Sequence, residues 1–139
     1  MATLEKAISI ALSAHQGQKD QAGAPYILHP LRVMLKMDSE EEMMAAVLHD
    51  IIEDTAWTLE DLEHEGFPRE LLEVLDQVTR RTGEPYEEFI VRAQVNPMAR
   101  KIKLADLEDN LDCTRIRQIT EPDLARIKRY HAAWWSLQL

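Results

Sequence analysis

The stretch that decides the fold is Met43-Met-Ala-Ala-Val-Leu-His-Asp-Ile-Ile-Glu-Asp-Thr55. Its first six residues are all apolar, which predicts a helix that is buried on most of its sides. Glu53 lies four residues after His49, and Asp54 lies four residues after Asp50, so on one helix these side chains share a face. The three carboxylates would repel one another there, and a bound cation would relieve the repulsion.

The alternative interpretation of the same residues is an ordinary acidic helix end that faces water. Acidic side chains are favoured in the first turn of a helix, where they complement the helix dipole. In a single helix over residues 43–55 they would stand in the last turn, where the dipole disfavours them. The electrostatics therefore favour a cation site.

Length and composition indicate one globular domain, which we expect to cover residues 1–139. Hydrophobic residues make up 45% of the chain, which argues against disorder. The only cysteine, Cys113, excludes an internal disulfide framework and fits a reducing cytoplasm. No apolar run reaches the roughly 18 residues of a membrane span, and the N-terminus lacks the pattern of a signal peptide. We therefore expect a cytoplasmic protein with no membrane partner.

The formal net charge of −9 argues against a protein that binds duplex nucleic acid, which normally presents a basic face, so no nucleic-acid partner is expected. A small anionic substrate remains compatible with this charge if a metal ion or a local basic cluster offsets the repulsion.

The helix signals along the chain predict an all-α bundle of roughly seven helices with unequal lengths. Thr3 is a predicted N-cap, and Ser39-Glu-Glu-Glu42 has the pattern of a capping box that opens the central helix. Prolines 30, 97 and 122 suit the first turns of further helices. Strand-like alternation of apolar and polar residues is absent from the sequence.

Four residues have side chains suited to a metal site: His29, His49, Asp50 and Asp106. Adjacent residues on a helix diverge by about 100°, but a cation between the directions of His49 and Asp50 could contact both. Two imidazoles and two carboxylates suit manganese, iron or zinc, and suit calcium poorly. A lone His29 would be a buried histidine; the His-Asp doublet and Asp106, four residues before Asn110, favour a metal site.

Five segments, in this order along the chain, resemble the HD-domain metal-dependent phosphohydrolases. The closer resemblance is to the hydrolase domain of the RelA/SpoT alarmone enzymes and to the single-domain small alarmone hydrolases. A bare His-Asp pair is a weak signal, whereas five ordered motifs are a strong one, and they imply an HD-domain helical bundle. The segments are His15-Gln-Gly-Gln18, Pro25-Tyr-Ile-Leu-His-Pro30, Ala45-Ala-Val-Leu-His-Asp-Ile-Ile-Glu-Asp-Thr55, Val78-Thr79 and Lys103-Leu-Ala-Asp-Leu-Glu-Asp-Asn-Leu111.

The resemblance also implies a role for each matching residue. Glu53 and Asp54 would orient and deprotonate the attacking water, and Asn110 would contact the sugar or phosphates of the substrate. The implied reaction removes the 3′-pyrophosphate of a guanosine tetra- or pentaphosphate and leaves GDP or GTP. One ion, usually Mn²⁺, would be held by His29, His49, Asp50 and Asp106.

One departure from the family pattern concerns the loop before Pro25. The family commonly has Arg-Lys there, whereas this chain has Lys19-Asp20-Gln21. Lys19 would replace the missing bases in part, and the preferred base is left open between guanosine and adenosine alarmones. Tyr26 is expected either in the core or in the wall of the nucleotide pocket.

Two other functions are compatible with the sequence. One is an HD phosphohydrolase that acts on another nucleotide, such as a deoxynucleoside monophosphate. The other is a non-catalytic domain that binds the alarmone or a protein partner. Trp134 and Trp135 are expected to pack the last helix or a second copy of the chain, so a homodimer is also left open.

Overall fold

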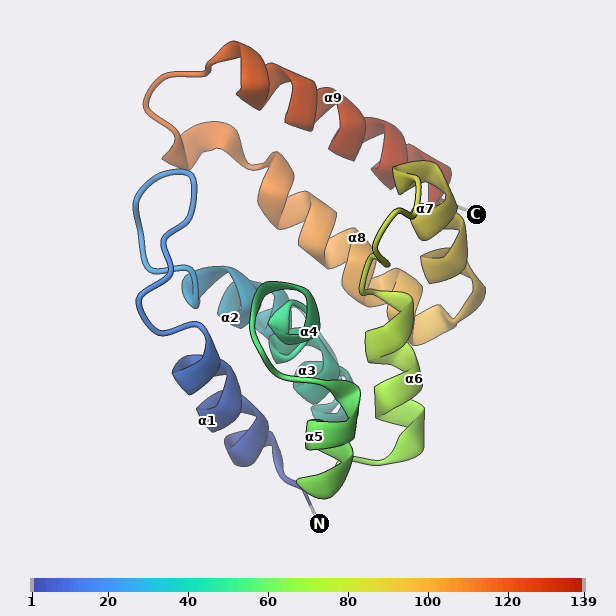
Figure 1. Cartoon of the computed structure of the whole chain (residues 1–139). Helices are drawn as coiled ribbons and strands as arrows, with labels where there is room; N and C mark the ends of the chain where they lie inside the picture. The colour runs from blue at the N-terminus through green and yellow to red at the C-terminus, as the bar shows by residue number, and fades with distance from the viewer. Residues whose placement is uncertain (1, 139) are drawn as a thin grey trace.

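The computed structural model describes residues 2–138 and consists of helices joined by short connections (Figure 1). Within those residues the only β-type pairing is an isolated bridge between Lys19 and Pro25. The predicted all-α class is confirmed, although nine α-helices are described where roughly seven were expected. The helices are α1 (Leu4–Ala14), α2 (Leu28–Leu35), α3 (Glu40–Val47), α4 (Ile51–Asp54), α5 (Leu59–His64), α6 (Arg69–Gln77), α7 (Tyr86–Val95), α8 (Pro97–Leu111) and α9 (Glu121–Ser136), with a 3₁₀ turn η1 (Cys113–Arg115) before α9.

Side-chain caps define where the helices begin. The Thr3 hydroxyl accepts the backbone N–H of Lys6 at 3.1 Å, as predicted. The Ser39 hydroxyl accepts the N–H of Glu42 at 3.2 Å, but the Glu42 carboxylate accepts the N–H of Asp38. The predicted capping box at Ser39 is therefore only half formed, because Glu42 caps the residue before the N-cap.

The hydrophobic core surrounds α3, which lies in the middle of the fold (Figure 1). Helices α1, α2, α6 and α8 pack against α3, and α9 packs along the outer side of α8. The larger buried cluster includes Val33, Val47, Leu48, Leu75 and Ile102, all almost fully buried. A smaller cluster joins α7, α8 and α9 through Phe89, Ile90, Leu107, Ala133 and Leu137.

The prediction of one continuous helix over residues 43–55 is wrong. Helix α3 ends at Val47, a turn follows, and the short α4 carries Glu53 and Asp54 in its first turn. The His49 ring explains the break, since its Nδ1 lies 2.6 Å from the carbonyl oxygen of Ala46. In a continuing helix that carbonyl would accept the N–H of Asp50, so the side chain competes with the backbone ladder.

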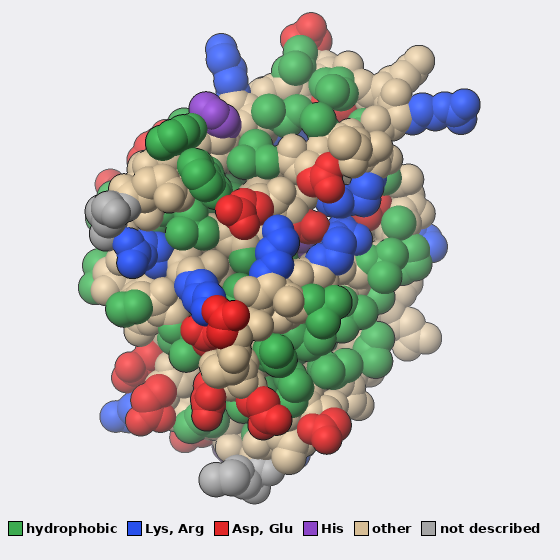
Figure 2. Space-filling model, turned by 180° about the vertical axis from the view of Figure 1, so that it is seen from behind, with side chains coloured by type: hydrophobic (Ala, Val, Ile, Leu, Met, Phe, Trp, Pro, Cys, Tyr) green, Lys and Arg blue, Asp and Glu red, His purple; other side chains and the backbone are tan. Residues whose placement is uncertain are grey.

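The exterior has an uneven charge distribution. On the face seen in Figure 2, acidic side chains gather toward the lower end, and most basic side chains lie in the middle and at the top. Within residues 2–138 no helix combines the length and apolar character needed to cross a bilayer.

The connection between α6 and α7 is fixed by one arginine. Arg92 donates to both carboxylate oxygens of Glu84, at 2.7 and 2.8 Å, and its remaining N–H groups donate to the carbonyl oxygens of Asp76 and Thr79. Hydrogen bonds from Arg92 lower the pKa of Glu84 to about 2, although burial opposes the shift. The ion pair therefore stabilises the fold at neutral pH.

We expect Glu84→Gln to lower the free energy of unfolding at pH 7 by about 2 kcal/mol, a typical value for a hydrogen bond to a charged group. The folded-state pKa of Glu84 is lowered, so its contribution is present above the unfolded-state pKa of about 4.3 and disappears as pH falls toward 2. Urea titrations at pH 7 and pH 3 measure this difference. Glu73→Gln, which alters an exposed carboxylate on α6, is the control; an equal loss for Glu84→Gln at both pH values would contradict the assignment.

Candidate metal centre

Two histidines and two aspartates converge inside the bundle. One nitrogen or oxygen of each of His29, His49, Asp50 and Asp106 lies within 4.8 Å of the others. Asp106 Oδ1 is 2.9 Å from His29 Nε2 and 3.3 Å from His49 Nε2. Asp50 Oδ2 is 3.1 Å from His49 Nε2 and 3.5 Å from His29 Nε2. The four residues that the sequence singled out as metal ligands are thus brought together by the fold.

Three helices position this cluster. His29 lies in the first turn of α2, Asp106 lies within α8, and His49 and Asp50 occupy the turn between α3 and α4. Helices α2, α3 and α8 pack against one another in every pair. The break after α3 is therefore part of the site, because it presents His49 and Asp50 toward α2 and α8.

Contacts outside the cluster determine which atoms of His49 and Asp106 face its centre. His49 Nδ1 donates to the carbonyl of Ala46, so its Nε2 faces the carboxylates. Lys103 Nζ contacts Asp106 Oδ2 at 2.8 Å, which leaves Asp106 Oδ1 to face the histidines. Two imidazole nitrogens and two carboxylate oxygens converging in this way fit a divalent ion of the manganese, iron or zinc type.

The carboxylates of the cluster and of Asp109 raise the pKa values of its two histidines. Burial alone would lower the pKa of His29, but hydrogen bonds to Asp106 and Asp109 raise it to about 9. Burial also opposes protonation of His49, and the adjacent Asp50 carboxylate raises its pKa well above the ordinary value. Burial would raise the pKa of Asp50, but His49 lowers it to about 2. Without a metal ion, the histidines therefore hold protons at neutral pH.

We expect the affinity for Mn²⁺ to rise with pH between 6 and 9, because the ion must displace protons from His29 and His49, whose pKa values are raised. Each displaced proton gives about a tenfold change in affinity per pH unit. Calorimetric titrations at several pH values, in buffers of different ionisation enthalpy, measure the affinity and the protons released. Binding that is independent of pH and releases no proton would contradict this assignment.

Glu53 and Asp54 stand beside the cluster on α4. Glu53 is exposed, and its Oε1 accepts the backbone N–H of Arg80 at 2.9 Å. Burial, followed by the charges of Asp50 and Glu53, raises the pKa of Asp54 to about 6. The charges of Asp50 and Glu53 thus add to burial in raising the pKa of Asp54, in line with the repulsion predicted from the spacing.

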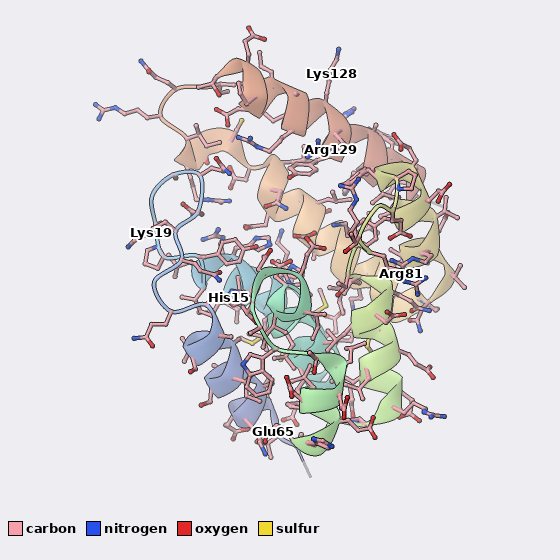
Figure 3. All side chains as sticks on the ribbon, viewed as in Figure 1. His15, Lys19, Glu65, Arg81, Lys128 and Arg129 are labelled. Atoms are coloured by element: carbon pink, nitrogen blue, oxygen red, sulfur yellow. The ribbon has the colours of Figure 1, made fainter. Side chains whose placement is uncertain are left out.

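The His15-Gln-Gly-Gln18 segment supports α4 from the end of α1. His15 Nδ1 lies 2.8 Å from Gln18 Oε1, and Gln18 Nε2 donates to the backbone carbonyl of Asp54 at 3.2 Å. Figure 3 labels His15 at this junction. The contact ties the short helix that carries the two acidic residues to the body of the fold.

A cavity of about 240 Å³ adjoins the cluster, with His29 in its wall. The three predicted substrate contacts, Lys19, Tyr26 and Asn110, all line it. Burial and the Asp50 charge raise the pKa of Tyr26, and its hydroxyl donates to Asp50 Oδ2 at 2.6 Å. Tyr26 therefore belongs to the wall of the cavity, one of the two expected positions.

The other two predicted contacts differ in position. Asn110 Nδ2 donates to Asp106 Oδ1 at 3.1 Å, so this residue joins the cavity to the cluster. Lys19 is exposed, at the edge of the fold on the loop after α1 (Figure 3). Asp20, which replaces a family base, accepts the backbone N–H groups of Ala22 and Ala24, each at 2.9 Å. Its carboxylate therefore holds the loop in shape.

The cavity also has charged residues that the sequence did not single out. Arg32 and Arg126 line it from α2 and α9, and Asp109 contacts both Arg32 and His29. Arg126 also contacts Asp123 on its own helix. Basic clusters near residues 115–117 and 126–129 were visible in the sequence, but such clusters are usually solvated helix faces, so only the fold identifies the cavity side chains.

Comparisons with known proteins agree with the geometry. The family model of the HD domain matches residues 7–121. The guanosine-3′,5′-bis(diphosphate) 3′-pyrophosphohydrolase of Aquifex aeolicus is 32% identical over 120 residues, which cover 78% of this chain and 17% of the relative. The enzyme of the same name from Haemophilus influenzae is 38% identical over 118 residues, 73% of this chain and 17% of the relative. The chain thus spans less than a fifth of these curated relatives.

The comparison with solved structures extends over the whole fold. A metazoan ortholog of SpoT that hydrolyzes ppGpp superimposes with a TM-score of 0.78 and 25% sequence identity. The match covers 99% of this chain and 85% of that one. The matched family model includes every residue of the metal cluster and both acidic residues of α4. The chain belongs to the HD domain family.

Proposed function

We propose that this domain hydrolyses the 3′-pyrophosphate of a nucleotide alarmone, (p)ppGpp or (p)ppApp, to pyrophosphate and the nucleoside 5′-diphosphate or triphosphate. The observation that carries the proposal is a buried His-His-Asp-Asp cluster that adjoins an open cavity and has two further carboxylates beside it. The pyrophosphohydrolases among the relatives support the choice of substrate.

One divalent ion, Mn²⁺ in our proposal with iron or zinc as alternatives, fits the cluster. Such an ion neutralises phosphoryl oxygens and lowers the pKa of a bound water. His29, His49, Asp50 and Asp106 would hold it, with their Nε2 and Oδ atoms directed inward. Tyr26 and Lys103 keep the two aspartates oriented, through hydrogen bonds to Asp50 Oδ2 and Asp106 Oδ2.

Glu53 and Asp54 supply the acid–base chemistry. Water adds to the phosphorus atom that is bonded to the 3′ oxygen, and the bond between this phosphorus and the 3′ oxygen breaks. A carboxylate removes the proton of the water, and the released 3′ oxygen gains a proton. A base works best when its pKa is near the working pH, and the pKa of Asp54, about 6, fits that requirement.

The cavity would hold the nucleoside part of the substrate. Tyr26 offers a ring surface, Asn110 an amide next to the cluster, and Lys19 a positive charge at the rim. Gln21, also in the wall, offers an amide where the family commonly has a base. An amide can donate and accept hydrogen bonds and so can pair with the edge of guanine or of adenine. The assay below therefore compares both bases.

The test is turnover by the purified protein with Mn²⁺ and a panel of ppGpp, ppApp and nucleoside monophosphates. Release of pyrophosphate from ppGpp or ppApp is the expected result, and the ratio of their rates gives the base preference. Release of inorganic phosphate from monophosphates alone would favour the other type of HD phosphohydrolase. Tight alarmone binding without product would favour a non-catalytic domain. Either of these two outcomes would overturn the proposal.

A further inference from the structure

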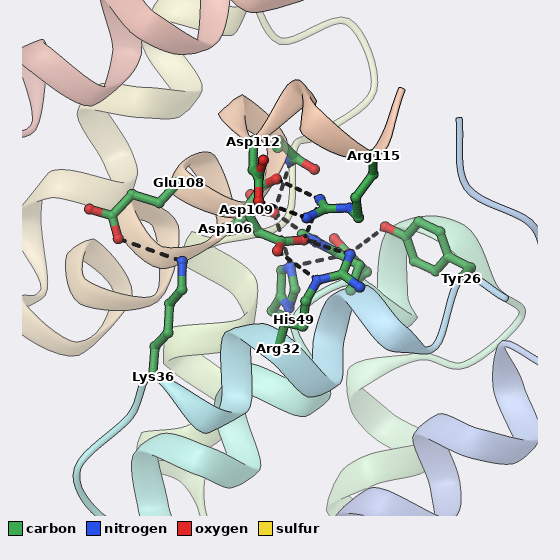
Figure 4. Close-up of polar contacts among 12 residues, drawn as sticks. Tyr26, Arg32, Lys36, His49, Asp106, Glu108, Asp109, Asp112 and Arg115 are labelled. Carbon is green, nitrogen blue, oxygen red and sulfur yellow. Dashed lines mark hydrogen bonds and ion pairs between the residues drawn. The ribbon is translucent and has the colours of Figure 1, made fainter. Parts of the chain in front are cut away.

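Asp109 is a buried carboxylate that faces away from the cluster and binds the far side of one of its histidines. Its side chain is 5% exposed, and Oδ2 lies 2.6 Å from His29 Nδ1. Arg32 donates from Nε to Oδ1 at 2.7 Å and from its terminal nitrogen to Oδ2 at 3.0 Å. Arg115 donates to the Asp109 backbone carbonyl at 2.9 Å. Figure 4 shows Arg32 and Arg115 beside Asp109.

These contacts keep Asp109 ionised. The Arg32 guanidinium, bonded to both carboxylate oxygens, favours the charged form of Asp109. An ionised carboxylate only accepts hydrogen bonds, so His29 must carry a proton on Nδ1. Without a metal ion His29 Nε2 also carries a proton and donates to Asp106 Oδ1 at 2.9 Å; a bound ion would displace that proton while Nδ1–H stays bonded to Asp109.

We propose that Asp109 is a positioning residue that fixes the ring orientation and the Nδ1–H form of His29, and that the two-point contact from Arg32 holds Asp109 in place. The inference rests on the metal site of the proposed function and adds to it the support behind that site. Such partners of metal-binding histidines are generally worth about 10- to 100-fold in metal affinity.

The test uses Zn²⁺ alone, because this ion is diamagnetic and allows the histidine protons to be observed by NMR. Asp109→Asn keeps the size of the side chain but removes its charge, and we expect it to lower Zn²⁺ affinity by about 10- to 100-fold. In ¹⁵N-labelled, Zn²⁺-loaded protein, the downfield His29 Nδ1–H signal should move upfield or exchange faster in this variant. A purely structural role for Asp109 would not alter that signal in a folded protein.

The matched control is Glu108→Gln, which removes the same charge one residue earlier on α8. Glu108 points to the other side, where it contacts Lys36 at 3.8 Å (Figure 4). It also accepts the N–H of Trp134 Nε1 at 3.1 Å. We expect its Zn²⁺ affinity and the His29 signal to match those of the unmodified protein. If Asp109→Asn does not fold, Arg32→Lys, which loses the two-point contact, should show the same changes at smaller size.

The inference would be overturned if the folded Asp109→Asn or Arg32→Lys protein bound Zn²⁺ within about twofold of the unmodified affinity and kept the His29 signal unchanged. Partners of this kind usually contribute more to metal affinity. No nucleotide is present in these measurements. Failure here is therefore distinct from failure of the hydrolase proposal, which is decided by product release.

Discussion

Replacing Asp106 with alanine is expected to abolish divalent-metal binding at the cluster and to lower alarmone hydrolysis by about 10³-fold or more. Asp106 Oδ1 is the oxygen that faces both histidines, at 2.9 and 3.3 Å, so its loss removes the centre of the donor set. A metal ion contributes several kcal/mol to phosphoryl transfer, and each 1.36 kcal/mol corresponds to about a tenfold change in rate. Mn²⁺ calorimetry and a pyrophosphate-release assay measure the two losses.

The same outcome is expected for His49→Ala and Asp50→Ala. The control is His64→Ala, which removes a histidine of α5 that lies outside the cluster. It should retain both metal binding and rate. Mn²⁺ affinity in Asp106→Ala equal to that of the His64→Ala protein would contradict the assigned ligands.

Glu53→Gln and Asp54→Asn are expected to keep the metal ion and lose rate, by about 10²- to 10⁴-fold, the range for general acid–base groups. The amide oxygen introduced by Glu53→Gln can still accept the N–H of Arg80, which the carboxylate accepts at 2.9 Å, so the fold of α4 should be retained. The carboxylate of Asp54 is not needed for the contact from Gln18, which goes to the backbone. Single-turnover rates at saturating Mn²⁺ measure the effect on chemistry separately from metal affinity.

Glu41→Gln provides the comparison, because it neutralises an exposed carboxylate of α3. Its single-turnover rate should equal that of the unmodified protein. If Glu53→Gln and Asp54→Asn both turn over at that same rate, neither residue serves as the base. If they lose the metal ion, they act as ligands instead.

The cluster of His29, His49, Asp50 and Asp106 could be anticipated because histidine and aspartate are residue types that bind metal ions. Histidine and aspartate within apolar stretches are costly to bury, and the fold does bury His49 and Asp106. The all-α class followed from helix starts such as Thr3, whose side-chain cap is formed as predicted. These features depend on local chemistry and on burial, which a sequence pattern carries directly.

The break before α4 could not be anticipated in the same way. Apolar residues continue on both sides of His49 and Asp50, so the pattern alone favours one helix. The break coincides with the His49 ring bonding the Ala46 carbonyl three residues earlier, a choice of side-chain partner that an apolar pattern does not reveal. Because of this break Glu53 and Asp54 stand in the first turn of α4, and the dipole argument based on a last turn was therefore wrong.

The sequence also did not predict which charged side chains line the cavity. Arg32 and Asp109 are 77 positions apart, and nothing local links them. Arg126 reaches the cavity because α9 packs back against α8. Long-range packing decides such partners, so a cluster of arginines in the sequence did not distinguish a substrate contact from a solvated face. The homodimer remains a prediction, with Trp135 60% exposed on α9.

The most direct measurement of the central claim is an anomalous difference map from crystals grown with Mn²⁺ and measured on both sides of the manganese absorption edge. We predict one strong peak within coordinating distance of His29 Nε2, His49 Nε2 and the carboxylates of Asp50 and Asp106. A map with no peak there, or with Asp106 turned away from an ion bound elsewhere, would contradict the metal centre and the hydrolysis assigned to it.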